Sequence, residues 1–472
     1  MNRSKRPNIL FILADDMGYG DLSAFNGGLS KTPTLDNLLD ESVCFTQHYA
    51  ASPVCNPSRA CLLTGRYPHR TGSVDTLEWR GLERLALRET TIADILKKEG
   101  YATGLVGKWH LGSFDKRYHP NARGFDEAAC FRGGMHSYYN WKLEYDDKIK
   151  RADGRYLTDV WTDEACQFID RHQNEPFFLH LTYNAPHTPL QAPEDDYKLF
   201  ADTGEFNKGL STLYAMIYRM DKGIARVLDK LKTLGLEDNT IVLFSSDNGP
   251  QFSGKDDALN FGTEEEMCTE RFNCQFNGSK GSVYEGGIRV PMIVRWPAGL
   301  EKGVQIDQMA HFSDWFPTIL AMAGVEKPQD SLPIDGVNIL PVLRGDNGKV
   351  NTKRFWQWNR YSPVVTSNSA IRDDDWKLIR PVIPETMQVD DIHWLMVCMY
   401  ESEHFLRNGI IKDPAPVYDV PQPPKPELYN IAEDPFEKNN LIDKYPDKAK
   451  KMLCELENWF EQVETERNTI KD

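Results

Sequence analysis

The residues best suited to chemistry lie in the segment C-N-P-S-R at positions 55–59. Asn56 is a favourable helix N-cap and Pro57 suits the first helical position, so we predict a helix that begins here and ends at Gly65. Cys55 would then lie just before a helix N-terminus, where free N–H groups and the helix dipole favour an anion. The alternative is an ordinary free cysteine buried near the start of a helix. The choice between them depends on what the rest of the chain brings to position 55.

Charged and polar residues follow four predicted strands at the points where those strands end. They are Asp15 and Asp16 after 8–14, Lys108 and His110 after 101–107, His187 after 177–183, and Asp247 and Asn248 after 240–245. Each set alone is explained by a turn, in which polar side chains satisfy backbone groups. In an open α/β sheet, however, ligands bind beyond the carboxyl ends of the parallel strands. Together the four sets predict one active site at this edge of the sheet.

These residue types describe a particular chemistry. Their oxygen donors suit a hard divalent cation, and a set with three carboxylates favours calcium, with magnesium as the alternative. The oxygen donors are Asp15, Asp16, Asp247 and Asn248. The positive charges and proton carriers are Arg59, Lys108, Lys280, His110 and His187. A cation, fixed positive charges and two histidines around a nucleophile describe the hydrolysis of an anionic ester.

The chain resembles the formylglycine-dependent type I sulfatases of the alkaline phosphatase superfamily over nearly its whole length. The motifs that carry the resemblance are P-N-I-L-F-I-L-A-D-D-M-G-Y-G-D, C-N-P-S-R, L-L-T-G-R-Y-P-H-R-T-G, G-K-W-H-L-G, N-A-P-H-T-P, S-S-D-N-G and G-S-K-G-S-V-Y-E-G-G-I-R-V-P. Taken together these motifs are highly specific. The resemblance implies an alkaline phosphatase-like fold and a sulfuric ester hydrolase.

The resemblance also implies a role for each residue. Cys55 would be oxidised to formylglycine by a maturation enzyme, and the hydrate of this aldehyde would attack sulfur. The metal ligands would be Asp15, Asp16, the modified Cys55, Asp247 and Asn248. The other roles would be steadying the hydrate (Arg59 and Lys108), acting on its hydroxyl (His110), facing the sulfate ester (Lys280) and protonating the leaving alcohol (His187). The family more often has a smaller residue at position 56, but Cys55, Pro57 and Arg59 are intact, so we expect maturation to proceed.

Short apolar runs alternate with helical patterns, which favours an α/β fold with a large mixed, mostly parallel sheet sandwiched by helices. We assign residues 1–345 to this catalytic domain and residues 346–472 to a smaller C-terminal α+β subdomain with an antiparallel sheet. The strands of the subdomain and its terminal helix are expected at 355–360, 370–380, 427–430 and 447–464. Residues 382–425, rich in proline and aromatic residues, are interpreted as an inserted loop.

Composition limits the partners of the chain. The formal net charge is 55 − 70 = −15, so the molecule repels polyanions at long range, which argues against nucleic acid. An anionic substrate must then be short or be caught by a local basic pocket. Nine cysteines are an odd number, and most of them are expected to be reduced core residues, although Cys268 and Cys274 could pair.

The N-terminus and the apolar runs bear on location. No run reaches transmembrane length, and no membrane partner is expected. M-N-R-S-K-R-P-N-I-L-F-I-L-A places basic residues before an apolar run, but the run is too short for a signal peptide and Asp15 follows at once. The sequence as given therefore predicts a cytoplasmic protein, or a periplasmic or secreted one if a leader has been trimmed.

Substrate recognition rests on fewer signals. His136 lies in the aromatic segment M-H-S-Y-Y-N-W at 135–141, which could stack on a sugar ring, and Arg360 follows two tryptophans in the second domain. Packing at a domain seam explains the aromatic residues equally well. We nominate His136 and Arg360 for specificity, and favour a sulfated oligosaccharide over a small sulfate ester. The alternatives are a broad arylsulfatase, a phosphonate or phosphate ester hydrolase, and a non-catalytic binding relative.

Overall fold

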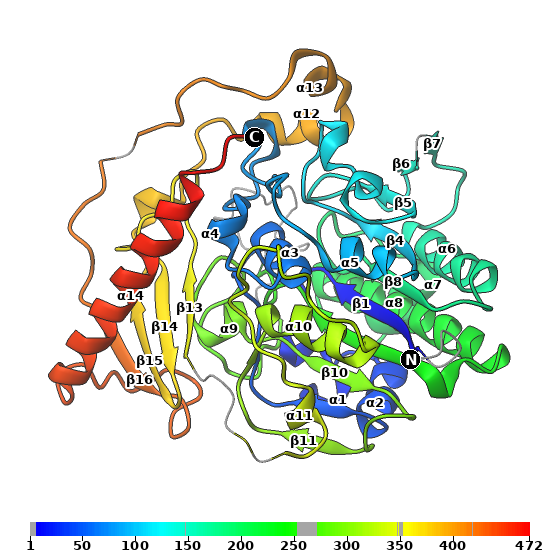
Figure 1. The fold of residues 1–472 in the computed structure, drawn as a ribbon, viewed down its shortest axis with the longest axis horizontal. Helices are drawn as coiled ribbons and strands as arrows, with labels where there is room; N and C mark the ends of the chain where they lie inside the picture. The colour runs from blue at the N-terminus through cyan, green and yellow to red at the C-terminus, as the bar shows by residue number, and fades with distance from the viewer. Residues whose placement is uncertain (1–5, 147, 253–270, 347, 349–352, 418) are drawn as a thin grey trace.

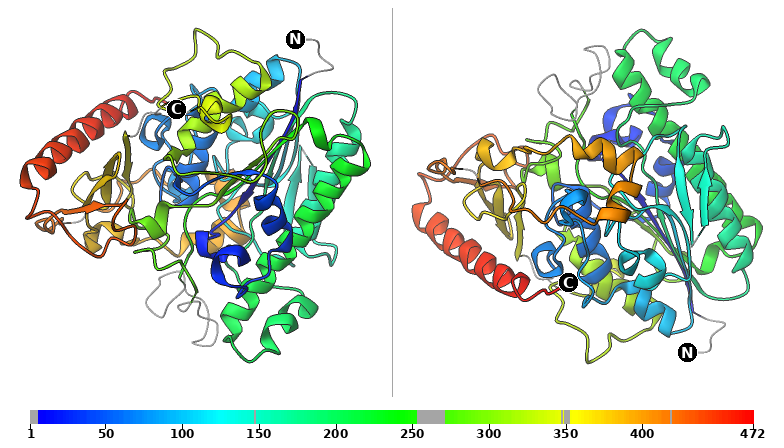
Figure 2. Two further views of the ribbon diagram at one scale, coloured as in Figure 1. Left: turned by 90° about the horizontal axis from the view of Figure 1, so that it is seen from below. Right: turned by 90° about the horizontal axis from the view of Figure 1, so that it is seen from above.

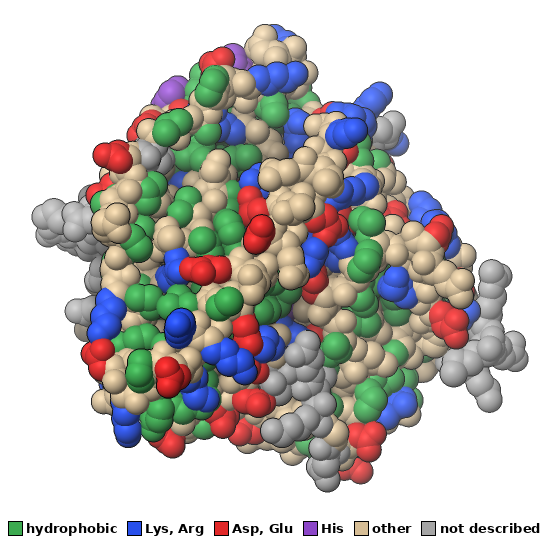
Figure 3. Space-filling model, turned by 60° about the vertical axis from the view of Figure 1, so that its left-hand side comes forward, with side chains coloured by type: hydrophobic (Ala, Val, Ile, Leu, Met, Phe, Trp, Pro, Cys, Tyr) green, Lys and Arg blue, Asp and Glu red, His purple; other side chains and the backbone are tan. Residues whose placement is uncertain are grey.

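The computed structural model describes residues 6–146, 148–252, 271–346, 348, 353–417 and 419–472. Its centre is a mixed ten-stranded sheet, and a separate four-stranded sheet lies beside it (Figure 1). The predicted fold class is therefore confirmed. In the part of the chain that is described, no helix is both long and apolar enough to span a bilayer. On the face shown in Figure 3, acidic and basic side chains are interspersed and do not gather by sign.

The large sheet has a parallel centre and antiparallel margins. Its strands, in spatial order, are β11 (Val304–Ile306), β2 (Val43–Phe45), β10 (Met292–Arg295), β9 (Thr240–Ser246), β1 (Asn8–Ala14), β8 (Phe177–Thr182), β4 (Ala102–Lys108), β5 (Glu127–Phe131), β6 (Lys142–Tyr145) and β7 (Lys148–Arg151). The five strands from β9 to β5 are mutually parallel, whereas β10 and β6 run antiparallel to their neighbours. The parallel centre thus ends at β9, because β10 returns in the opposite direction beside it.

Both faces of this sheet are covered by helices, as alternation along a buried strand requires. Ile9, Phe11 and Leu13 of β1 belong to the core on one face, and Leu10 and Ile12 to the core on the other. The first core is completed by α3 (Cys55–Thr64), α5 (Ile92–Lys98) and α10 (Phe312–Ala323). The second is completed by α2 (Pro33–Asp40), α6 (Leu157–Arg171) and α8 (Lys208–Thr233).

Shorter elements connect these layers. The short helices are α1 (Ser23–Asn26), α4 (Pro68–Thr71), α7 (Glu194–Ala201), α9 (Glu285–Ile288) and α11 (Leu340–Leu343). A two-stranded ladder is formed by β3 (His48–Tyr49) and β12 (Ala310–His311). The 3₁₀ turns are η2 (Tyr19–Asp21), η3 (Glu78–Arg80), η4 (Lys116–Tyr118), η5 (Pro120–Arg123), η6 (Glu237–Asn239) and η8 (Pro384–Met387).

The smaller sheet is antiparallel, in the order β13 (Lys353–Gln357), β14 (Ser369–Asp373), β15 (Trp376–Arg380) and β16 (Glu427–Asn430). The long helix α14 (Pro446–Arg467) packs on it and lies along its outer side in Figure 2. The single strand expected at 370–380 is wrong: it is a hairpin, because Asp374 takes a left-handed backbone with φ of 53° and reverses the chain.

The segment 382–425 also differs from the expected loop. It contains α12 (Trp394–Tyr400) and α13 (Glu403–Asn408), which lie at the same end of the molecule as β6 and β7 (Figure 1). Cys398 and Phe405 of these helices are buried against Leu77, Trp79 and other apolar side chains. The helical part of the segment, 394–408, is therefore a packed part of the fold.

The sheet brings four strand ends to one edge. Ala14 of β1 is level with Ser246 of β9, and Thr182 of β8 is level with Leu13 of β1 and Gly107 of β4. Because these strands are parallel, the residues that follow each of them emerge together. This register is what positions the candidate site.

Candidate active site

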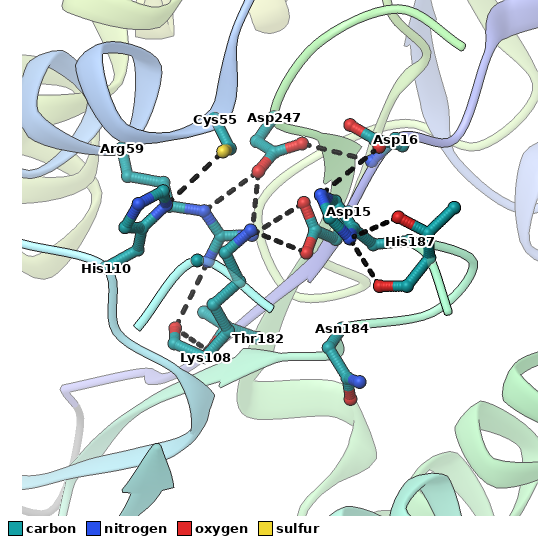
Figure 4. A network of polar contacts seen from close by, with 12 residues as sticks. Asp15, Asp16, Cys55, Arg59, Lys108, His110, Thr182, Asn184, His187 and Asp247 are labelled. Atoms are coloured by element: carbon teal, nitrogen blue, oxygen red, sulfur yellow. Dashed lines mark hydrogen bonds and ion pairs between the residues drawn. The ribbon is translucent and has the colours of Figure 1, made fainter. Parts of the chain in front are cut away.

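The helix that carries Cys55 starts earlier than predicted. Cys55 is the first residue of α3, Val54 is the N-cap with extended backbone, and Gly65 ends the helix in the left-handed conformation. Cys55 is 2% exposed, and its Sγ atom lies 3.3 Å from Nδ1 of His110 (Figure 4). Position 55 therefore sits within the first turn, among the N–H groups that lack helical acceptors.

Asn56 has a different role from the capping role predicted for it. Its side-chain amide donates to the backbone carbonyls of Glu83 and His110, both at 2.7 Å. The residue is fully buried. The larger side chain at this position thus ties the start of α3 to the segment that carries His110.

Three buried carboxylates each face a cation. Lys108 Nζ lies 2.7 Å from Asp15 Oδ2, and Lys280 Nζ lies 2.7 Å from Asp16 Oδ2. The guanidinium of Arg59 donates through Nε to Asp247 Oδ2 at 2.8 Å (Figure 4). Asn248, next along the chain, donates its amide to Asp16 Oδ1 at 2.7 Å. Residues from β1, β4, β9, α3 and the 277–289 loop therefore meet at one point.

The oxygen atoms left over at this point fit a hard divalent cation. Asp15 Oδ1 and Asn248 Oδ1 are buried and, among the described residues, have no hydrogen-bond donor. The side-chain ligand atoms of Asp15, Cys55 and Asp247 lie within 4.8 Å of one another. Burial first, and then the Asp15 carboxylate, raise the pKa of Asp247. Buried acceptors without donors are costly, and a cation bound by carboxylate and amide oxygens would satisfy them.

The two histidines are neutral in this environment. Burial, followed by the charges of Lys108 and Arg59, lowers the pKa of His110 well below its ordinary value. Burial and Lys280 lower the pKa of His187 to about 3. His187 Nδ1 lies 2.7 Å from the carbonyl of Thr188, which requires the proton on Nδ1. Nε2, 3.6 Å from Asp16 Oδ2, is then the atom that would bind a proton when an anionic ester is present.

Two site residues have unusual backbone conformations. Asp16 has a φ of 64° and His110 a φ of 55°, in the left-handed region that residues other than glycine rarely adopt. Each lies within two residues of a strand end, where the chain must turn sharply across the sheet edge. Such strain is typical of sites where side-chain direction matters more than local stability.

The loop that carries His187 is held by Tyr138. The Tyr138 hydroxyl lies 2.6 Å from the carbonyl of Asn184 and 2.9 Å from that of His187, and its side chain is completely buried. The indole N–H of Trp161, on α6, donates to the side chain of Asn184 at 3.0 Å. Tyr138 is therefore a packed core residue and not the sugar-stacking residue that the 135–141 segment suggested. Its hydroxyl supports the loop that carries His187.

Removal of this hydroxyl should affect turnover. We expect Tyr138→Phe to lower kcat about tenfold, because one buried carbonyl loses its donor at a cost of about 1–3 kcal/mol and the His187 loop relaxes. Tyr156→Phe is the matched control, because the Tyr156 ring stacks on that of Tyr138 but its hydroxyl donates to the backbone carbonyl of Gln191. Steady-state kinetics check this, and equal kcat values for the two variants would refute it.

Lys280 is placed by backbone hydrogen bonds on two sides. Its own N–H donates to the Pro250 carbonyl at 2.9 Å, and the N–H of Gly281 donates to the Pro53 carbonyl at 2.8 Å. These bonds connect the 277–289 loop to the end of β9 and to the entry of α3. Lys280 is thereby fixed relative to both Asp247 and Cys55.

His136 and Arg360 lie outside this network. Arg360 Nη1 pairs with Asp75 Oδ1 at 2.9 Å and stacks over Trp358. His136 is 7% exposed, and its Nε2 contacts the backbone of Lys142. Trp356 is buried, with its indole N–H on the Ala50 carbonyl. Cys268, considered as a partner of Cys274, lies outside the described residues.

Glu78 was missed by sequence reasoning. It is 5% exposed on η3, and its Oε1 lies 3.7 Å from Nε2 of His110. Burial and the neighbouring Glu83 raise its pKa to about 7. A single acid in an irregular segment gives no sequence signal, because its partner is remote in the chain. Glu78 and Cys55 thus lie on opposite sides of the His110 ring.

The chain matches known protein families over the large sheet and most of the smaller one. Residues 7–325 match the Sulfatase family model, and residues 277–393 match the model of the N-sulphoglucosamine sulphohydrolase C-terminal region. The uncharacterized sulfatase YdeN of Escherichia coli is 33% identical over 390 residues, which cover 72% of this chain and 66% of YdeN. Human N-acetylgalactosamine-6-sulfatase is 33% identical over 398 residues, covering 75% of this chain and 72% of the human protein.

Solved structures agree. The crystal structure of Ps i-CgsB in complex with k-i-k-neocarrahexaose has a TM-score of 0.77 and 31% identity. The match covers 96% of this chain and 92% of that protein, and so includes the C-terminal sheet. The family model alone covers most of the large-sheet region and every residue of the metal and nucleophile cluster. The chain therefore belongs to the sulfatase family of enzymes.

Proposed function

We propose that this protein is a sulfuric ester hydrolase that removes sulfate from a sulfated carbohydrate, with formylglycine made from Cys55 as nucleophile. The observation that supports this best is the buried meeting of Cys55, the carboxylates and the cations at one edge of the sheet. A protein that only bound its ligand would not need a potential nucleophile at position 55 beside a neutral histidine. Nor would it need three cations around that position. The chain spans 66% of the length of YdeN, so its activity as a whole is inferred from this geometry and from family membership.

Each side chain has a part in this proposal. Arg59 and Lys108 hold negative charge beside position 55, and His110 Nδ1 accepts a proton from the nucleophile. Lys280 neutralises the ester sulfate, whose charge in turn favours a proton on His187 Nε2, so that His187 protonates the leaving alcohol. Formylglycine would supply a hydrate with two hydroxyls, one for attack and one whose deprotonation releases sulfate. A maturation enzyme is the partner that this requires.

Calcium is the proposed cation, with magnesium as the alternative. Asp15, Asp16, Asp247, Asn248 and the oxygen of formylglycine would hold it, and when bound it would polarise the ester oxygen as a Lewis acid. All the protein donors are oxygen atoms, as hard cations prefer.

Removal of the metal should lower the thermal stability of the protein as well as its activity. We expect a chelator to lower the thermal midpoint, because cation binding at a hundred times Kd contributes about 2.7 kcal/mol. Calcium should restore the midpoint better than magnesium at equal concentration. In Asp247→Asn the midpoint should no longer respond to calcium. A wild-type midpoint that chelation leaves unchanged would contradict the cation site.

A carbohydrate substrate is supported by the relatives. The human relative is named for a sulfated amino sugar, and the Ps i-CgsB structure contains a neocarrahexaose. The test is turnover of sulfated saccharides, aryl sulfates and phosphonate esters by matured enzyme, read as released sulfate or phosphonate. We expect sulfated saccharides to be hydrolysed with the highest kcat/KM. Preferential turnover of phosphonate esters, or absence of turnover of every sulfate ester, would refute the proposal.

A further inference from the structure

A cleft of about 440 Å³ lies beside the site, between the margin of the large sheet and the inserted helices. We call it the lateral cleft. One wall comes from β5, β6 and β7 and the segment between β5 and β6, and the other from α12 and α13. Its polar lining includes Glu78, Arg132, His136, Lys142, Glu144 and Arg151. The inner end reaches Glu78, which is 3.7 Å from His110.

Two cations face each other across this lining. Lys142 of β6 and Arg151 of β7 are direct partners in the antiparallel register. Like charges placed opposite each other destabilise a sheet. Burial and then Arg151 lower the pKa of Lys142, as expected of two cations that share a site. Lys142 also contacts Glu403 of α13, whereas Arg151 is exposed. A bound anion would remove the repulsion between Lys142 and Arg151.

His136 provides a second, independent observation. Its side chain is more than nine-tenths buried and lines the cleft. Nε2 contacts the N–H and carbonyl of Lys142, and Nδ1 has no hydrogen-bond partner among the described residues. In either tautomer Nδ1 is a buried polar atom without a partner, which is costly unless a ligand supplies one.

The rim of the cleft is apolar and exposed. Ile149 is 51% exposed, Tyr400 is 47% exposed and Leu406 is 51% exposed. They come from β7, α12 and α13, which converge only in the folded chain. Apolar and aromatic side chains of this kind suit the face of a sugar ring, while the charges inside suit its anionic substituent. Arg132 is already paired with Glu144 at 2.9 Å, and Lys142 with Glu403. Arg151 has no acidic partner among the described residues, so the anion site is placed at Arg151 and the neighbouring Lys142.

We propose that the lateral cleft binds an anionic sugar residue adjacent to the one whose sulfate is removed. This inference rests on the proposed function and refines it. The preferred substrate is an oligosaccharide with at least two anionic groups, one at Lys280 and one at Lys142 and Arg151. Helices α12 and α13 of the inserted segment then serve as the second wall of the binding site.

The test compares two charge-matched double variants. Lys142→Gln/Arg151→Gln removes the proposed anion site, and Lys148→Gln/Lys150→Gln removes two charges from β7 alone. Lys148 and Lys150 alternate with Ile149 and Arg151 along β7, and Lys150 lies over the Tyr145 ring on the other face. Both variants should unfold within a few degrees of wild type, because charges and ion pairs that are exposed or only partly buried contribute little to stability.

Affinity electrophoresis through gels that contain ι-carrageenan, chondroitin 6-sulfate or heparin provides the measurement. Wild type and the control variant should be retarded by at least one of these polymers and not by its desulfated form. The Lys142→Gln/Arg151→Gln variant should bind the same polymer at least tenfold more weakly. Equal retardation of both variants would overturn the inference, and so would the absence of wild-type retardation by all three polymers.

The proposed function can be judged separately. Hydrolysis of 4-nitrophenyl sulfate by the matured wild-type enzyme tests sulfatase chemistry without a neighbouring sugar. Hydrolysis of this ester together with equal polymer binding by both double variants would reject the cleft and keep the sulfatase. Polymer binding through Lys142 and Arg151 without hydrolysis of any sulfate ester would keep the binding site and reject the catalytic proposal.

Discussion

Cys55→Ala is expected to lower sulfate ester turnover by about three orders of magnitude or more and to leave the fold intact. The substitution removes the only group that maturation could convert into the nucleophile, and loss of a nucleophile costs most of the rate enhancement. The side chain lost is small, so the cavity should cost only about 1 kcal/mol of stability. Kinetics on a sulfated saccharide and a thermal melt measure the two effects.

Cys61→Ala is the matched control for this experiment. Cys61 lies on the same helix and is equally buried, but it belongs to the apolar core on one face of the large sheet. We expect similar stability in the two variants and near-normal turnover only in Cys61→Ala. Wild-type turnover by Cys55→Ala would mean that another residue is the nucleophile.

Lys377→Met is expected to cause the largest loss of stability. Lys377 of β15 is completely buried and lies 2.9 Å from Glu285 and 2.8 Å from Glu437. Removing one partner of a buried ion pair leaves charge without compensation and costs about 3–5 kcal/mol. The midpoint of chemical denaturation measures this loss.

The same substitution should also reduce activity through Lys280. Glu285 lies in α9, five residues after Lys280. Asn368, which directly precedes β14 of the C-terminal sheet, donates to the Gly281 carbonyl at 2.9 Å. The C-terminal sheet thus supports the loop that presents Lys280 to the substrate. We expect a higher KM as well as the stability loss, because the loop loses one of its anchors.

Lys353→Met is the control for Lys377→Met. Lys353 lies on β13 of the same sheet and pairs with Glu455 at 2.8 Å, but its side chain is 32% exposed. Partly exposed pairs contribute about 0–1 kcal/mol, so this variant should behave much like wild type. An equal loss of stability in both lysine variants would mean that the buried ion pairs of Lys377 contribute no more than a partly exposed pair.

Local patterns were enough to predict much of the fold. Asn8–Ala14 is a strand with the predicted bounds because an uninterrupted apolar run can be buried on both faces of a parallel sheet. The helix Pro33–Asp40 also follows from local sequence, because Pro33 suits a first helical position and apolar residues recur at helical spacing. The four polar segments after strands meet because the parallel order β9–β1–β8–β4 aligns their ends.

The features that the sequence did not predict share a physical cause. Each depends on contacts with residues that are distant in the chain. The turn at Asp374 lies within a run of residues that otherwise favours one strand. The helices of 382–425 are short and are stabilised by burial against Trp79 and Leu77, which periodicity within the segment does not reveal. Glu78 and Lys377 are single charged residues, and only the tertiary structure shows what each one faces.

The central claim is that the working residue at position 55 is no longer a cysteine. Mass spectrometry of the tryptic peptide that contains position 55, from protein produced with a formylglycine-generating enzyme, tests it most directly. The account predicts the mass of formylglycine at this position and sulfatase activity in proportion to the converted fraction. Full activity in protein whose Cys55 is an unmodified thiol would contradict it.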